Sequence, residues 1–363
     1  MGLARSRGRS MRDGGVRHPD VDMWMATMGA PGAAALLDFA GQEYGFRSAA
    51  GVPRWGSIAA DMVFSRASAA GRWPSAGEYE MVGSGVLRYD HDPVSRAPLG
   101  VRIEGAATNL VVNSTVLTTS RMLSVTAQTY TLAMEGAGSI ALSGAYTGSL
   151  SGGATRQSLT FAPSAGSLTL TPTGEVLRVQ LEAGTVPSSY IVTGASAVTR
   201  AAERLYLDLP FDPASEGVTI LWDGVLPASP ASIPVAFGLT NPSGVADRLM
   251  LYAAGSTGFG AVGTYVHSPG YDAYFAPPPM WRTFTAGARR RVVVRLTPTA
   301  LSLSQNGDAV TSAALVTPTP TGLTRCYIGG VYGGNQWKST ISRVAAWRGA
   351  PFSDAQMREL SAL

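Results

Sequence analysis

Short runs in which apolar and polar residues alternate recur along most of the chain. In the run 167–171, Leu168 and Leu170 would lie on one face of an extended strand and the hydroxyl residues between them on the other. Comparable runs, separated by Gly, Ser and Pro, lie at 129–134, 138–142, 157–161, 167–171 and 177–182. Short strands with turn residues between them predict an antiparallel β-sandwich.

A second series of alternating runs begins at residue 201. Asn306 and Gly307 interrupt it with a hairpin signal, because both residues tolerate the positive φ angles of a type I′ turn. The runs lie at 205–209, 218–222, 235–239, 248–252, 291–296, 300–305 and 341–347. Together the two series predict an all-β fold, with two antiparallel sandwiches of jelly-roll or concanavalin-like type in tandem.

The last residues predict a short helix instead of a strand. Ser353 suits the N-cap, Gln356 three residues later completes a capping box, and Phe352 can pack against Met357. The residues that would share the face toward the body are Met357, Leu360 and Leu363.

The segment 86–114 combines apolar runs with polar residues at definite positions. Its pattern predicts a strand, a turn at 98–100 and a second strand. Asp90 and Asp92 would project to one side of the first strand, as a hydrolase or calcium site requires. Pro93 follows at once, however, and Asp-Pro usually starts a turn, so a turn or ion-pair role is favoured.

Glu104 lies among apolar and small residues and is expected to be partly buried. Burial of a carboxylate requires a compensating charge, for which Arg66 or Arg88 is suitable. Structural pairing is therefore favoured over general-acid chemistry. The chain has three histidines and neither a Gly-x-Ser-x-Gly motif nor metal-ligand spacing of His or Cys. We expect no catalytic residue, no metal site and no cofactor.

Composition narrows the function classes further. Charged residues make up 14% of the chain, against about 25% in typical globular domains. The net charge is only +4, and basic residues are not interleaved with aromatic ones as nucleic-acid binding requires. The basic cluster 289–291 therefore indicates a solvated strand start. The single cysteine, Cys326, excludes an intramolecular disulfide and is expected to be buried.

The first 35 residues are expected to form a flexible arm or anchor that orders on a partner. The segment lacks the apolar core of a signal peptide, and no apolar run in the chain approaches the roughly 20 residues of a membrane span. We therefore expect no membrane insertion. The predicted organisation is an arm at 1–35, one sandwich unit at 36–202 and a second at 203–363.

Two loops carry the residues most suited to ligand binding. Aromatic rings crowd the segment 264–284, and the segment 335–337 combines amides with an indole. Rings can stack on the C–H faces of a sugar while polar neighbours bond its hydroxyl groups. Alternatively, these rings plug the end of a sandwich or pack a subunit interface. The candidate glycan-binding residues are Tyr271, Asp272, Tyr274, Trp281, Arg282, Asn335, Gln336 and Trp337.

The motifs at 64–68 and 88–114 together resemble a module of fibre and spike proteins of tailed phages and related particles. They comprise Phe-Ser-Arg-Ala-Ser, Arg-Tyr-Asp-His-Asp-Pro, Leu-Gly, Ile-Glu, Thr-Asn-Leu and Asn-Ser. The segment 179–201 is similar to the part of that module that closes a carbohydrate-module-like sandwich. Arg102 stands where an apolar residue is usual, and Val192 where a proline is common. More weakly, 203–363 is similar to concanavalin-like and laminin-G-like sandwiches, through Leu-Ser-Leu-Ser-Gln-Asn-Gly and the C-terminal strand and helix.

The resemblance implies a host-attachment spike or fibre of a phage or phage-derived gene-transfer particle. Such a protein would bind cell-surface or capsular polysaccharide without catalysis, lie on the head or tail of the virion, and form a homo-oligomer, either a trimer or a pentamer. Its N-terminal arm would contact other particle proteins. The alternatives are a capsule-degrading glycan hydrolase and a purely structural adaptor of the particle. The identity of the sugar stays open.

Overall fold

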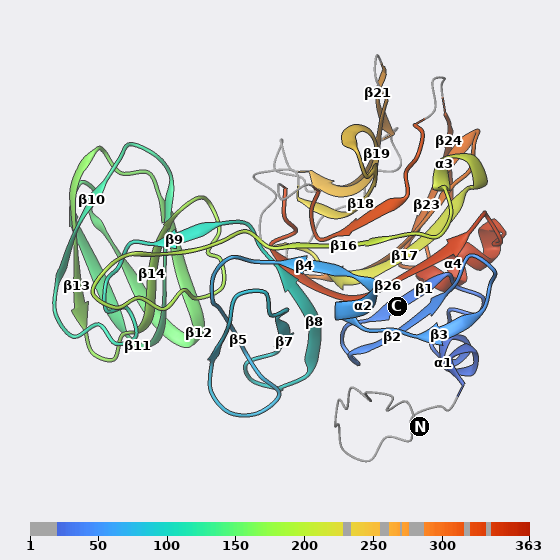
Figure 1. Ribbon diagram of the computed structural model, residues 1–363. Helices are drawn as coiled ribbons and strands as arrows, with labels where there is room; N and C mark the ends of the chain where they lie inside the picture. Colours follow the sequence, from blue (N-terminus) through green and yellow to red (C-terminus); the bar gives the residue numbers. More distant parts are fainter. Residues whose placement is uncertain are drawn as a thin grey trace.

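A computed structural model describes residues 20–227, 234–254, 261–268, 271–275, 287–315, 320–331 and 335–363, with side chains left undescribed at 244–246, 254, 261–268 and 271–275. The described chain is all-β, as the alternation predicted, and its strands form two bodies (Figure 1). The larger body contains both termini of the described chain, and the smaller one is built from residues 107–200.

Two antiparallel sheets make the larger sandwich. The first runs in the order β24 (Thr311–Ala314), β23 (Ala300–Gln305), β22 (Arg289–Leu296), β17 (Val218–Val225), β26 (Ser339–Arg348), β1 (Ala35–Asp38), β2 (Glu43–Arg47) and β3 (Pro53–Trp55). β8 (Pro98–Ile103) also pairs with β26, and β7 (Tyr89–His91) pairs with β8. The second sheet runs β21 (Tyr271–Phe275), β20 (Ala261–Ser268), β19 (Gly244–Ala254), β18 (Val235–Asn241), β25 (Arg325–Ile328), β16 (Arg204–Asp208) and β4 (Val63–Ser65).

The alternating residues of these strands supply one large core. Ile220 and Trp222 on β17 pack in the same buried cluster as Phe237 and Leu239 on β18, and all four are almost completely inaccessible to solvent. Cys326 belongs to this cluster and is buried, as predicted. Since a packed apolar core is the main favourable term in folding, this contact joins the two sheets.

The smaller sandwich is formed by β10 (Arg121–Val125), β11 (Tyr130–Gly144), β12 (Gly148–Phe161), β13 (Gly166–Thr173) and β14 (Leu177–Ala183). The runs predicted at 129–134 and 138–142 are two halves of one strand, β11. The register of β11 against β12 shifts on either side of Gly136. The first half pairs with β14 and the second with β13, and both halves contribute residues to a separate apolar core.

The smaller sandwich is an insertion, and the order of the sandwiches along the chain therefore differs from the predicted tandem. Strands β1 to β4, β7 and β8 lie in the sheets of the larger sandwich, together with strands from 204–348. The short two-stranded sheet of β9 (Ala107–Asn109) and β15 (Val198–Arg200) lies at the two crossovers. Sequence pattern did not indicate this, because β1 pairs with β26, about 300 residues away along the chain.

Residues 20–35, expected to be part of a flexible arm, are folded. Asp20 caps α1 (Val21–Thr27), whose Trp24 and Met25 are buried against the outer side of the first sheet. Gly45 on β2 lies directly under this helix, since an added Cβ would approach the Met25 methyl group to 2.6 Å. Apolar packing therefore anchors this segment, and residues 1–19 lie outside the described chain.

The remaining predictions of local structure are mostly confirmed. Helix α4 (Asp354–Ser361) begins with the Ser353–Gln356 capping box, and Met357 and Leu360 pack on the sheet, whereas Leu363 is exposed. Asn306 and Gly307 have φ angles of 47° and 81° at the β23–β24 turn. The other short elements are α2 (Ile58–Asp61), α3 (Pro213–Glu216), β5 (Ala70–Arg72) and β6 (Glu80–Val82). No described helix is long and apolar enough to cross a membrane.

Candidate functional site

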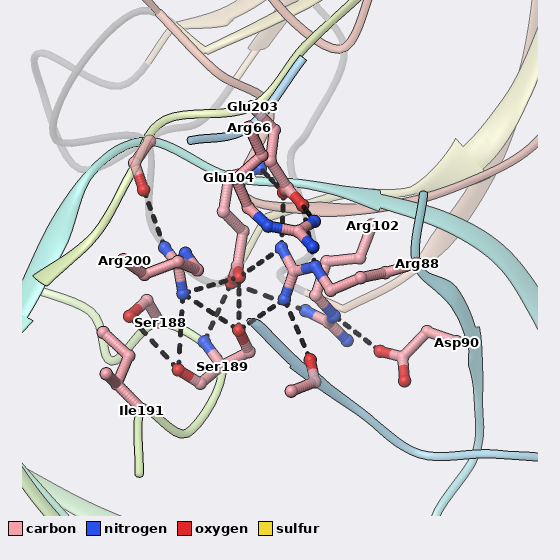
Figure 2. A network of polar contacts seen from close by, with 12 residues as sticks. Arg66, Arg88, Asp90, Arg102, Glu104, Ser188, Ser189, Ile191, Arg200 and Glu203 are labelled. Carbon is pink, nitrogen blue, oxygen red and sulfur yellow. Dashed lines mark hydrogen bonds and ion pairs between the residues drawn. The ribbon is translucent and has the colours of Figure 1, made fainter. Parts of the chain in front are cut away.

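A network of buried ion pairs occupies the two crossovers between the sandwiches (Figure 2). Arg88 lies at its centre with no exposed surface. Its Nη2 donates to Glu104 Oε2 at 2.9 Å, and its Nε donates to Glu203 Oε1 at 2.8 Å. Arg66 donates to the same Glu203 oxygen at 2.8 Å. Glu104 and Glu203 stand at the exit from the larger sandwich and the return to it, and the Glu203 backbone N–H donates to the Glu104 carbonyl at 2.9 Å.

The smaller sandwich contributes two residues to the same network. Arg200 lies 3.0 Å from Glu104 Oε2, and the Ser189 hydroxyl donates to that oxygen at 2.5 Å. Burial by itself would raise the pKa of Glu104, but Arg200, Arg88 and Arg102 hold the pKa well below its usual range. Glu104 is therefore ionised at neutral pH and connects the two crossovers through its ion pairs. The predicted pairing with Arg88 is confirmed, whereas Arg66 binds Glu203 instead.

The predicted turn and carboxylate pair differ from the structure in detail. The turn lies at 92–97, and Pro98, Leu99 and Gly100 belong to β8. Asp92 accepts the Val94 and Ser95 backbone N–H groups at 3.0 and 2.7 Å, so it shapes the turn. Asp90 is buried and accepts from Arg102 Nε at 2.5 Å. The structural role favoured for both acids is confirmed. No group of acids, histidines or cysteines in the described chain could hold a metal ion.

A cleft of about 430 Å³ opens between the sandwiches, next to this network. The cleft is lined from the larger sandwich by Asp90 and Arg102, and by Trp73 directly after β5 (Ala70–Arg72), which pairs only with β6. From the smaller sandwich it is lined by Glu135, Arg156, Arg178, Ser189 and Tyr190. Tyr79 also lines the cleft, and its hydroxyl donates to the Tyr190 carbonyl at 2.8 Å across the junction. Burial raises the pKa of Tyr79 to about 12, so the hydroxyl stays protonated. The cleft exists only where both sandwiches meet.

Backbone and cation–π contacts fix the orientation of Trp73 at the edge of the cleft. The Trp73 backbone N–H donates to Asp90 Oδ1 at 2.9 Å, and the Trp73 backbone carbonyl accepts the His91 backbone N–H at 3.1 Å. The guanidinium groups of Arg96 and Arg178 lie 5.1 and 5.3 Å from the ring centroid. Trp73 remains half-buried and lines the cleft.

The sequence-predicted binding residues lie elsewhere. Trp337 is completely buried; its Nε1–H donates to the Val225 carbonyl at 2.8 Å and its ring packs against Trp222. Its assignment to a sugar site is therefore wrong, because no face of the indole is free. Gln336 is also buried, at 6% exposed, whereas Asn335 is exposed.

The other five predicted residues are only partly covered by the structure. Tyr271, Asp272 and Tyr274 lie on β21, at the edge of the second sheet opposite β4, and their side chains are outside the described residues, as are Trp281 and Arg282 altogether. Their role stays a prediction. The sequence pattern did not single out Trp73, Arg156 or Arg178 as binding residues. Nothing in the local pattern shows that residues 73, 156 and 178 meet.

Comparison with known proteins gives structural likenesses only. No protein-family model and no curated protein matches the sequence. The carbohydrate-binding module 40 of the Ruminococcus gnavus IT-sialidase, bound to α2,3-sialyllactose, is 19% identical over 41% of this chain and 84% of its own, with a TM-score of 0.34. The carbohydrate-binding module 2 from the evolved Dit protein of Lactobacillus casei BL23 phage J-1 is 9% identical over 47% and 83%, with a TM-score of 0.29. Mouse laminin α1 domains LG4-5 are 14% identical over 69% and 87%, with a TM-score of 0.24. These neighbours are carbohydrate-binding and laminin-G β-sandwich domains.

Proposed function

We propose that this protein binds a glycan without catalysis, and that the cleft between the two sandwiches holds the saccharide. One observation carries the proposal: the cleft combines an oriented indole with several charged hydrogen-bonding groups drawn from both sandwiches. Its volume of about 430 Å³ lies in the range of small-ligand sites, which typically combine apolar walls with a few placed polar groups. Pro93, Val94 and Leu99 supply apolar surface for the C–H faces of a sugar.

The state of the nearby acids supports binding over hydrolysis. A glycosidase needs one carboxyl group that stays protonated near neutral pH, with its pKa raised by its surroundings. Glu104 has the opposite property, since three arginines lower its pKa. Asp90 is engaged by Arg102 and by the Trp73 N–H. Glu135, the other acid that lines the cleft, pairs with Arg178. Burial raises the pKa of Glu182, but Glu182 does not line the cleft, so the alternative of a capsule-degrading hydrolase is less well supported.

The biological setting we propose follows from the sequence resemblance alone. In it, the protein is a host-attachment spike or fibre on the head or tail of a phage or gene-transfer particle. It would bind cell-surface or capsular polysaccharide, contact other particle proteins through its N-terminal residues, and assemble as a trimer or pentamer. Several copies on one particle would strengthen weak binding at each site, because the local concentration of sites is high.

Binding of the full-length protein to arrayed capsular and cell-surface glycans tests the proposal. We expect Trp73→Ala to reduce binding at least tenfold without changing the oligomeric state. Trp281→Ala, on the segment predicted from sequence, should leave binding unchanged. The reverse result, with loss only in the Trp281 variant, would move the site to the second sheet. Release of oligosaccharides from purified capsule would instead establish the hydrolase, and binding to no glycan would favour the structural adaptor.

A further inference from the structure

Arg156, on the β12 side of the cleft, has an unusual set of contacts. Its Nη1 donates to the Ser188 carbonyl at 3.1 Å. Its Nε and Nη2 are both buried, and neither has a hydrogen-bond partner. Burial lowers the pKa of Arg156 from its ordinary value. A buried guanidinium with two unsatisfied donors is costly, because the water removed from it is not replaced by another acceptor.

Each of the other three arginines that line the cleft has a carboxylate partner. Arg102 pairs with Asp90 at 2.5 Å, Arg178 Nε donates to Glu135 at 2.9 Å, and Arg72 Nε donates to Glu80 at 2.7 Å. Glu182, the remaining buried acid nearby, accepts from Ser188 and Gln180. No ion pair to Arg156 is found among the described residues. Arg156 is therefore the one arginine lining the cleft that has no ion-pair partner among the described residues, although Glu135, Glu182 and Glu104 lie close enough to raise its pKa in part.

The two unsatisfied nitrogens of Arg156 are Nε and Nη2. In two other arginines of this protein, the same two nitrogens bind a carboxylate. Arg325 donates from Nε and Nη2 to the two oxygens of Asp208, at 2.7 and 2.9 Å. Arg289 does the same to Asp223, at 2.7 and 2.8 Å. Nε and Nη2 lie on one edge of the planar guanidinium and match the spacing of carboxylate oxygens. In Arg156 this edge is the one without protein acceptors.

We propose that Arg156 binds the carboxylate of an acidic sugar, of the uronic-acid class, in the cleft. The proposal rests on the proposed glycan-binding function and deepens it by naming the substituent that is recognised. The carboxylate accepts from Nε and Nη2, while the sugar ring lies toward Trp73 and the apolar residues of the cleft. Because the two nitrogens are shielded from water, binding includes a small movement of the side chain or of the cleft wall.

Calorimetric titration of the full-length protein tests this assignment. The probes are oligogalacturonate and a hyaluronan tetrasaccharide, each beside its carboxyl-reduced form, and a sulfated neutral oligosaccharide. The variants are Arg156→Lys, which keeps the charge but loses the two-pronged edge, and Arg156→Gln. Arg121→Lys is the matched control, because Arg121 belongs to the same sandwich, lies outside the cleft and bonds to carbonyl and hydroxyl oxygens.

We expect at least one acidic probe to bind, at least tenfold more tightly than its reduced form, and both Arg156 variants to lose that preference. Arg121→Lys should retain it. Arg156→Gln should not lower the melting temperature, since it removes a buried charge that no residue pairs. The assignment is overturned if the carboxyl-reduced and acidic forms bind equally tightly, or if the sulfated neutral oligosaccharide binds as tightly as the acidic probe. It is also overturned if Arg156→Lys binds the acidic probe as tightly as the wild type does. Binding of neutral saccharides that depends on Trp73 would preserve the proposed function while overturning this inference; binding of no saccharide would overturn both.

Discussion

Burial of a guanidinium is costly unless carboxylate and carbonyl oxygens replace the water that it loses. Arg88 meets this condition fully, with two glutamates, the Ser189 hydroxyl and the Gly71 carbonyl around it. Burial lowers the pKa of Arg88, but Glu203 and Glu104 more than reverse the effect, so the net shift is upward. The charge at this junction is thus shared among residues on both crossovers, and loss of one member leaves the others unpaired.

Replacement of Glu104 by Gln should therefore destabilise the protein by about 3–5 kcal/mol, the usual cost of breaking a buried ion pair. The folded-state pKa of Glu104 lies below its ordinary value of 4.5. Its contribution is accordingly complete above about pH 4.5 and is lost as the pH falls through the folded pKa. Denaturant unfolding of wild type and variant between pH 3 and 7 measures both effects, and the gap between the two proteins should narrow toward low pH.

A matched control for this change is Glu80→Gln. Glu80 also pairs with an arginine, Arg72, but both side chains are partly exposed. Exposed pairs contribute about 0–1 kcal/mol, because water screens them. Equal losses of stability in the two variants, or a Glu104→Gln difference that does not depend on pH, would contradict the role assigned to the buried network.

The residue-scale chemistry was only partly accessible from sequence. Glu104 could be identified as a buried, paired acid because small and apolar residues surround it. Its partners Ser189 and Arg200 could not be identified from sequence, since they lie 85 and 96 residues further along the chain. They come close to Glu104 only because the smaller sandwich is an insertion. Trp337 was misassigned for a related reason. An indole beside Asn and Gln in a loop matches a sugar site in sequence, while its burial under Trp222 depends on the fold.

At the scale of elements, alternation predicted where strands form but not which strands pair. The assignment of 98–100 as a turn shows the difficulty, since Pro and Gly are common turn residues and here they begin β8. Gly100 has a φ of +96°, and an added Cβ would lie 2.1 Å from the Ile341 carbonyl oxygen on β26. The glycine is required by close contact between two strands, which sequence pattern alone cannot distinguish from a turn.

Gly100→Ala should consequently weaken the attachment of β8 to β26. Positive φ costs a residue with a side chain about 1–3 kcal/mol, and the contact with Ile341 adds a further overpacking cost of about 1–3 kcal/mol. Gly85→Ala separates the two terms, because Gly85 has a φ of +70° and nothing within 4 Å of an added Cβ. Thermal unfolding of both variants should show a clearly larger loss for Gly100. Equal losses would mean that the strands separate slightly to admit the methyl group.

At the scale of the whole molecule, the smaller sandwich has its own apolar core and is connected to the larger sandwich by two adjacent crossovers. Its apolar cluster contains residues from 111–181 only, and the larger core contains none of them. The chain leaves and returns at Glu104 and Glu203, which are joined by a backbone hydrogen bond of 2.9 Å. The two bodies thus share the ion-pair network and the cleft, and neither requires the other to complete its apolar core.

Excision of residues 106–201, with a short Gly-Ser linker joining Gly105 to Ala202, should leave a folded larger sandwich. Removal of Arg200 and Ser189 still leaves Arg66 and Arg88 opposite Glu104 and Glu203, so the buried charges of the remaining network balance. We expect a cooperative thermal transition with a reduced melting temperature, measured by circular dichroism. Glycan binding should disappear in the excised protein, because Arg156, Arg178 and Tyr190 leave the cleft with the insertion. Full binding by the excised protein would instead assign recognition to the larger sandwich, where the β21 segment predicted from sequence lies.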